Sequence, residues 1–346
     1  MTSPTISLVL GSGGARGYAH IGAIEELRAQ GFDIRSVAGS SMGALVGGVY
    51  AAGKLDAFRD WARALQRFDV LRLLDWTFSG GGFIKGDRVI EQIRSLIGDI
   101  RIEDLPISYT AVAVDLYAQR EVWFSRGPLF DAIRASIAIP TVFRPHHYEG
   151  RTLVDGGLLN PVPITPTLRD LTDCTIAIDV NAPAEPLSAA ATAPALAAAG
   201  GESGAGDSTF GSVGAALPSA TEADGGVEHV SATPALASVE TGEPATTPNG
   251  YRRKIAGFID SLLEKREKKH ALANDPGVLE LFARSLDAVQ ETVTRFKLAA
   301  QPPDLIVSIP RNVCAFYEFH RAEEVIEFGR LRTREALRHW QVPVRR

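Results

Sequence analysis

The sequence has little of several features that mark particular protein classes. Only two of its 346 residues are cysteines, Cys174 and Cys314, so we expect neither a disulfide framework nor a zinc site. The formal net charge of −5 disfavours a protein organised around nucleic acid, because such proteins carry a basic face. No window approaches the roughly 20 continuous apolar residues of a membrane span. Residues 1–14 lack the basic region of a secretory signal, so we expect a cytoplasmic protein.

Lysine and arginine are absent from residues 183–250. This segment is rich in alanine, glycine, serine, threonine and proline, and it carries only scattered acidic residues. Such a composition offers too little large apolar surface to offset the entropy lost on ordering. The sequence therefore predicts a disordered insertion here, outside the folded domain.

Short β-rich runs alternate with helical stretches from about residue 6 to residue 180, a pattern typical of a parallel sheet covered by helices. The strand candidates are residues 5–10, 34–40, 109–116, 121–125 and 175–180. The helix candidates are residues 21–30, 56–74 and 85–99. We therefore expect an α/β fold of three layers, with a mainly parallel central sheet flanked by helices.

Ordered structure is expected to resume over residues 251–342. Residues 304–310 predict one more buried strand and residues 319–340 a final helix. Because the sheet needs that strand, we assign this part to the same domain as residues 5–181.

Residues 251–270 have apolar positions at helical spacing between two basic clusters. Such a helix either lies on anionic lipid, giving a peripheral membrane contact through residues 252–269, or packs its apolar stripe on the domain. The sequence leaves both interpretations open.

The pentapeptide G-S-S-M-G, residues 39–43, follows a predicted strand and precedes a helix-prone segment. In a nucleophile elbow, glycines such as Gly39 and Gly43 let the backbone turn sharply and expose the serine hydroxyl. Ser41 is thus the candidate nucleophile. The alternative is a helix N-cap in which Ser40 or Ser41 only satisfies backbone donors.

A serine nucleophile needs a group that accepts its proton. Asp155 follows an apolar run and precedes Gly156 and Gly157, which places its carboxylate on a tight turn open to a ligand. Asp155 is the candidate general base, although D-G-G is also an ordinary turn signal. A lone histidine is more often a structural residue, so three histidines are disfavoured as bases, namely His20, His146 and His147.

The glycine-rich segment G-S-G-G-A-R-G, residues 11–17, lies between the first predicted strand and a helix. A dinucleotide site would need an acidic residue at the end of the second strand, and a P-loop would need G-K-[ST]; the sequence has neither. The remaining role is an oxyanion hole, made of backbone N–H groups at a helix N-terminus. Arg16 could meet a phosphate headgroup or form a structural salt bridge.

Four segments in this order resemble the patatin-like phospholipases, in particular their compact bacterial members: GSGGARGYAHIGAIEEL, GSSMG, ASIAIPTVFRP and DGGLLNPVP. The resemblance covers residues 5 to about 181 and extends to the final strand and helix. It implies a patatin-like lipid acyl hydrolase with a Ser–Asp dyad and without metal, other cofactor or catalytic histidine. On this basis Ser41 is the nucleophile and Asp155 the base. The oxyanion loop is Gly13, Gly14, Ala15 and Arg16, and the elbow and motif glycines are Gly11, Gly39, Gly43, Gly156 and Gly157.

We therefore expect a serine hydrolase that cleaves fatty-acyl esters such as phospholipids through an acyl-enzyme, with residues 131–145 packed near the elbow. Two alternatives stay open. The first is an α/β-hydrolase-type esterase with a Ser-Asp-His triad, for which His320 and His339 are the available histidines. The second is a non-catalytic lipid-binding or regulatory module that keeps the elbow as a scaffold.

Overall fold

The computed structural model describes residues 3–66, 82–84, 87–186 and 278–343. All of them belong to one compact unit, Met1–Gly201 with Val278–Arg346. Most of the predicted insertion and the predicted helix at 251–270 lie outside the described residues, so both stay predictions.

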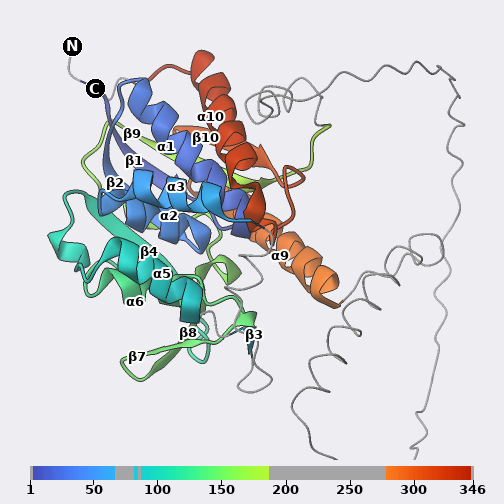
Figure 1. The fold of residues 1–346 in the computed structure, drawn as a ribbon. Coiled ribbons are helices and arrows are strands. Elements are labelled where there is room, and N and C mark those ends of the chain that lie inside the picture. The colour runs from blue at the N-terminus through green and yellow to red at the C-terminus, as the bar shows by residue number, and fades with distance from the viewer. Residues whose placement is uncertain (1–2, 67–81, 85–86, 187–277, 344–346) are drawn as a thin grey trace, which may run out of the picture. The chain divides into compact units, whose positions relative to one another are not determined.

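A mixed sheet forms the centre of this unit (Figure 1). Its strands are β1 (Thr5–Leu10), β2 (Asp33–Ser40), β4 (Ser108–Asp115), β5 (Arg120–Phe124), β7 (His146–Tyr148), β8 (Arg151–Asp155), β9 (Cys174–Ala182) and β10 (Leu305–Pro310). The order is β10-β9-β1-β2-β4-β8-β7, with β5 paired to β4. All pairs from β10 to β4 are parallel, whereas β5, β7 and β8 pair antiparallel. A separate pair joins β3 (Gly82–Ile84) to β6 (Thr141–Phe143).

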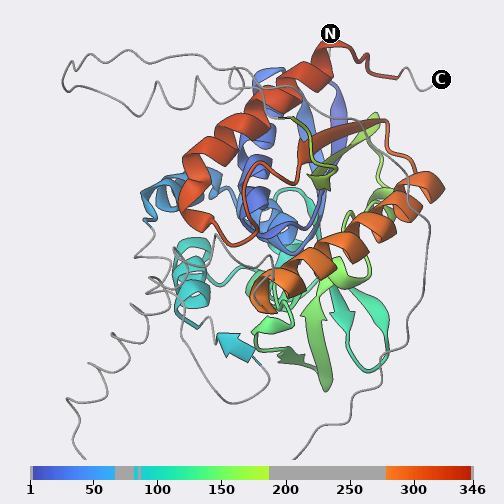
Figure 2. The same cartoon turned by 90° about the vertical axis from the view of Figure 1, so that its right-hand side faces the viewer.

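Helices cover both faces of the sheet. They are α1 (Ala19–Ala29), α2 (Met42–Ala51), α3 (Leu55–Ala64), α5 (Asp87–Ile97), α6 (Leu129–Ser136), α9 (Val278–Ala300) and α10 (Ala322–Arg338). Helices α1 and α10 pack on each other, and α2 packs on β2 and β4. Helix α9 contacts β9 and lies apart from α10, which contacts β10 (Figure 2).

Strand β1 shows how alternate residues build the two apolar layers. Ile6, Leu8 and Leu10 are fully buried in the main core, which also contains the side chains of α1, α2 and α10. Val9 points the other way, as expected for successive residues of a strand. It packs in a second cluster with Val162, Ile164, Ala177 and Leu298 of α9. The predicted α/β fold, a mainly parallel sheet flanked by helices, is confirmed.

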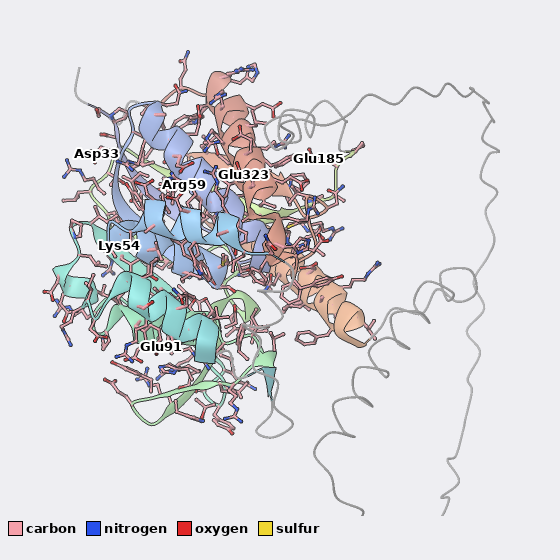
Figure 3. The ribbon with its side chains drawn as sticks, in the orientation of Figure 1. Asp33, Lys54, Arg59, Glu91, Glu185 and Glu323 are labelled. Carbon is pink, nitrogen blue, oxygen red and sulfur yellow. The ribbon has the colours of Figure 1, made fainter. Side chains whose placement is uncertain are left out.

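Ion pairs join helices on the outer side of the main core (Figure 3). Arg59 of α3 contacts Glu25 of α1 at 2.7 Å, and Arg63 of α3 contacts Glu323 of α10. Pairs of this kind contribute roughly 0–1 kcal/mol each at a protein surface, so the apolar layers carry most of the stability. Among the described helices, none has the length and apolar character needed to cross a membrane.

The structure corrects one predicted helix and adds elements that were not predicted. The helix expected over residues 56–74 ends at Ala64, because the next residue, Leu65, has an extended backbone (φ −69°, ψ 117°). Residues 67–74 lie outside the described part of the chain. Strands β3, β6 and β7 were not predicted, since three residues are too few to show a period. Strand β8 was recognised only as an apolar run before Asp155 and not as a strand. Helix α9 was not predicted either.

Candidate active site

Ser41 occupies a strained turn between β2 and α2. Its backbone has φ 55° and ψ −124°, a region that residues with side chains rarely adopt. A Cβ atom added to Gly43 would lie 2.1 Å from the carbonyl oxygen of Leu10, and one added to Gly39 would lie 2.4 Å from that of Gly43. The predicted strand, sharp turn and helix are therefore present, and they set Ser41 at the carboxyl end of β2.

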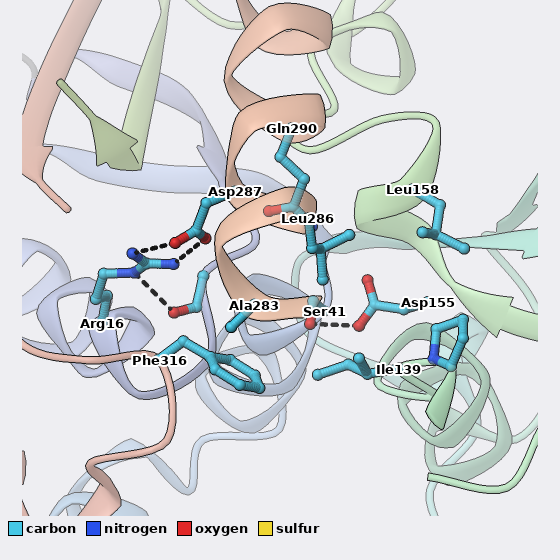
Figure 4. Close-up of a pocket in the computed structure, with 13 residues that line it drawn as sticks. Arg16, Ser41, Ile139, Asp155, Leu158, Ala283, Leu286, Asp287, Gln290 and Phe316 are labelled. Carbon is cyan, nitrogen blue, oxygen red and sulfur yellow. Dashed lines mark hydrogen bonds and ion pairs between the residues drawn. The ribbon is translucent and has the colours of Figure 1, made fainter. Parts of the chain in front are cut away.

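Ser41 and Asp155 meet at this edge of the sheet although 114 positions separate them in the chain. The Ser41 hydroxyl donates a hydrogen bond to Asp155 Oδ2 at 2.5 Å (Figure 4). Asp155 ends β8 and is held by the Gly157 N–H, which donates to its Oδ1 at 2.7 Å. Ser41 is 4% exposed and Asp155 3%. The structure thus brings together the two side chains on which the predicted chemistry depends.

The surroundings of Asp155 favour its protonated form. Burial raises the pKa of its carboxyl from the ordinary 3.8 to about 7, although the hydrogen bonds from Ser41 and Gly157 act in the opposite direction. A base whose pKa lies near neutral pH is well suited to take a proton from a hydroxyl and return it to a leaving group.

Ser136, at the end of α6, fixes the backbone of the elbow. The Ser41 N–H donates to Ser136 Oγ at 2.9 Å, and the Ser136 hydroxyl donates to the carbonyl oxygen of Val112 at 2.6 Å. Two residues later, the carbonyl oxygen of Ala138 accepts a hydrogen bond from the Asp155 N–H at 2.9 Å. The segment expected to pack near the elbow therefore contacts both members of the pair.

The glycine-rich loop lies beside Ser41, and Gly13 and Gly14 line the pocket above it. Gly14 has φ 57°, and a Cβ atom there would lie 2.5 Å from the side chain of Phe316. The Ala15 N–H donates to the carbonyl oxygen of Phe316 at 2.8 Å, and the Arg16 N–H donates to that of Gly13 at 3.3 Å. Because those two amides are engaged, the amides of Gly13 and Gly14 are the remaining candidates among the four residues of the predicted oxyanion loop.

Arg16 forms the salt bridge, one of the two roles considered for it. Its buried guanidinium contacts the Asp287 carboxylate at 2.7 and 3.3 Å, and its Nε donates to the carbonyl oxygen of Gly13 at 3.2 Å (Figure 4). Arg16 thereby ties the glycine-rich loop to helix α9.

The pocket over Ser41 is narrow and mostly apolar. Its cavity volume of about 20 Å³ is room for roughly one water molecule. The apolar lining residues are Ile139, Pro140, Leu158, Ala283, Leu286 and Phe316. Three of them come from α9 and the loop before α10, so the C-terminal part of the chain closes the pocket.

The sequence interpretation missed the contribution of α9. Besides Ala283, Leu286 and Asp287, this helix supplies Gln290, whose Oε1 accepts hydrogen bonds from Ser12 Oγ at 3.1 Å and Asn181 Nδ2 at 3.0 Å. The signal available was a run of more than 20 residues, 278–301, without glycine or proline.

None of the histidines in the described part of the chain lines this pocket. His20 Nε2 pairs with the Gly11 carbonyl oxygen at 2.8 Å, and burial lowers the pKa of His20 to about 4. His146 and His147 lie on β7, while His320 and His339 flank α10. Across the described residues, no group of three His, Cys, Asp or Glu side chains is arranged to hold a metal ion.

Fold and site together define an α/β protein with a buried serine–aspartate pair at a strand–turn–helix elbow. The sequence pattern of the patatin-like phospholipase family matches residues 8–168. An uncharacterized NTE family protein of Mycobacterium tuberculosis is 40% identical to this chain, over 99% of this chain and 93% of its own length. The chain belongs to the patatin-like phospholipase family, as its four sequence segments predicted.

Other relatives match only about half of this chain. A patatin-like phospholipase domain-containing protein of Caenorhabditis elegans is 35% identical over 52% of this chain and 14% of its own length. The neuropathy target esterase of Drosophila persimilis is 32% identical over 47% of this chain and 12% of its own. The crystal structure of VipD from Legionella pneumophila aligns with a TM-score of 0.35 and 13% identity, over 57% of this chain and 54% of that one, a likeness too distant to support an argument.

Proposed function

We propose that this protein is a serine acyl hydrolase that cleaves fatty-acyl esters of lipids with a Ser41–Asp155 dyad. The observation that carries the proposal is the 2.5 Å hydrogen bond from the Ser41 hydroxyl to the buried Asp155 carboxylate. The substrate class is supported by membership of the patatin-like phospholipase family and by similarity to a neuropathy target esterase.

In the first half-reaction, Ser41 Oγ attacks the ester carbonyl carbon while Asp155 takes the hydroxyl proton. The carbonyl oxygen becomes negatively charged, and the amides of Gly13 and Gly14 stabilise it. When the tetrahedral intermediate collapses, the bond to the leaving alcohol breaks and Asp155 gives its proton to that oxygen. The acyl group then remains on Ser41.

In the second half-reaction, Asp155 takes a proton from a water molecule that attacks the acyl carbonyl carbon. The fatty acid leaves and Ser41 regains its proton from Asp155. The apolar lining of the pocket suits the first carbons of an acyl chain. Because the cavity of about 20 Å³ holds about one water, substrate entry requires displacement of side chains from α9 or of Phe316.

The test is a screen of p-nitrophenyl esters and phospholipids with three matched variants. Ser41→Ala removes the nucleophile, and we expect covalent catalysis to disappear. Asp155→Asn removes the base, and we expect a loss of about 100-fold or more in kcat. Ser40→Ala is the control. The Ser40 hydroxyl is buried and has no hydrogen-bond partner among the described residues, so this variant should keep wild-type activity.

Three results would contradict the proposal. If Ser41→Ala hydrolyses the esters as fast as the wild type, the nucleophile is assigned wrongly. If His320→Ala or His339→Ala is inactive while folded, the triad alternative holds. No hydrolysis of any ester by the folded wild type would favour a binding module.

A further inference from the structure

We propose that the outer face of helix α9 is the surface by which the protein docks on a phospholipid–water interface. This inference rests on the proposed function, because the substrate of a lipid hydrolase is supplied from such an interface. The outer face is defined here by Leu281, Val289 and Phe296, with Arg284 and Arg295 along its edge.

Helix α9 has two faces of different roles. Its inner face supplies Leu286, Asp287 and Gln290 to the pocket over the serine–aspartate pair. On the outer face, large apolar side chains stand in solvent: Leu281 is 55% exposed, Val289 52% and Phe296 74%. At about 100° per residue these three fall within an arc of roughly 80°, on the side of the helix away from the pocket. One element therefore covers the site and presents an apolar stripe outward.

Polar contacts on the inner face fix which side of α9 points outward. Asp287 pairs with Arg16, Gln290 bonds to Ser12 and Asn181, and Lys297 contacts Glu121 at 2.7 Å. Turning the helix to bury its apolar stripe would break all of these bonds and leave the buried guanidinium of Arg16 without its carboxylate, which is costly. The polar contacts of the inner face therefore keep the apolar stripe exposed in the described unit.

The charges of α9 suit a surface that carries phosphate groups. Asp287 contacts Arg16, and Glu291 contacts Arg311 at 2.6 Å and lies 3.8 Å from Arg295, whose side chain is 74% exposed. On the outer face of the described helix the charged residues are arginines, in a chain whose net charge is −5. An apolar stripe edged by arginines on a helix is the pattern of an interfacial helix, whose side chains enter the lipid layer while the cations meet phosphate.

The two faces together make a kinetic prediction. Docking through the outer face should raise hydrolysis of lipids in vesicles, because it brings the interface next to the pocket. Docking contributes nothing to hydrolysis of a short ester dissolved as single molecules. Loss of the stripe should therefore lower hydrolysis of lipids in vesicles and leave hydrolysis of the dissolved ester unchanged.

The experiment uses the full chain and a triple variant, Leu281→Ser with Val289→Ser and Phe296→Ser. A matched control, Leu168→Ser with Leu171→Ser, removes exposed leucines that precede β9, at the opposite end of the parallel strands from the pocket. Binding to phosphatidylcholine–phosphatidylglycerol vesicles is measured by co-sedimentation, and hydrolysis is measured on these vesicles and on p-nitrophenyl butyrate.

For the triple variant we expect vesicle binding and vesicle hydrolysis to fall about tenfold or more, and hydrolysis of the soluble ester to stay unchanged. The control should match the wild type in all three measurements. The docking proposal is wrong if the triple variant binds vesicles like the wild type, or if the wild type does not bind them.

Two further outcomes distinguish lipid docking from dimerisation through the same stripe and from the proposed hydrolase function. If the wild type is a dimer that the triple variant dissociates, and vesicle binding is unchanged, a second copy of the chain covers the stripe and the lipid assignment is overturned. If neither substrate is hydrolysed but vesicle binding still depends on the stripe, docking stands and the proposed function fails.

Discussion

Catalysis by the proposed dyad depends on pH, because Asp155 must be ionised to accept the Ser41 proton. Burial raises the pKa of Asp155 to about 7. At pH 5 only roughly one carboxylate in 100 is then ionised, since each pH unit below the pKa reduces the ionised fraction about tenfold. We therefore expect kcat/KM to rise about tenfold from pH 5 to pH 6 and to reach a plateau above about pH 8.

The assay follows release of the acid from a short soluble ester by chromatography, so that titration of a chromogenic product does not enter. Circular dichroism at each pH checks that the protein stays folded. The Asp155→Asn variant should show a low rate with no step near pH 7, because the titrating base is gone.

A rate that is already maximal at pH 5 would contradict a raised pKa of Asp155, since it would mean that the carboxyl keeps its ordinary pKa of 3.8. A step near pH 7 that persists in Asp155→Asn would assign the titration to another group. In that case histidine variants would identify it.

Three other predictions follow from the same site. Because the pKa of the Asp155 carboxyl is raised in the folded state, its stabilising contribution is present at low pH and is lost as the pH rises from 3.8 to about 7. Asp155→Asn should therefore be more stable than the wild type in urea at pH 8, by up to about 4 kcal/mol. At pH 3 the variant should be no more stable than the wild type. Ser136→Ala leaves the Ser41 N–H buried without its acceptor, so we expect a loss of about 1–3 kcal/mol in the free energy of unfolding and a lower kcat. Gly14→Ala should lower activity and melting temperature more than Gly53→Ala, because both have positive φ but only the added methyl at Gly14 meets other atoms.

The sequence predicted the serine and the aspartate because each depends on a local pattern. Ser41 stands in a glycine-flanked turn after a strand, and Asp155 precedes two glycines. Their meeting depends on strand order, since β4 lies between β2 and β8 and carries Ala113 opposite Asp155. The family resemblance implied that the two residues act as a pair, but the strand order that joins them was not predicted.

The part of the chain that closes the pocket over Ser41, helix α9 and Phe316, could not be predicted from local sequence patterns. Helix α9 turns Asp287 and Gln290 toward the protein and leaves Phe296 in solvent, which reverses the usual placement of polar and apolar residues. Its packing is decided by partners far away in the chain, above all Arg16. The engagement of the Ala15 amide likewise depends on the carbonyl oxygen of Phe316, a distant partner that a local pattern does not reveal.

The most direct test of the central claim is to locate the residue that a fluorophosphonate probe labels. This probe reacts with an activated serine hydroxyl, and mass spectrometry of the digested protein identifies the modified side chain. We expect one label on Ser41 in the wild type and none in Ser41→Ala. A folded wild type that takes up no label, or a label on Ser40 or Ser136, would contradict it.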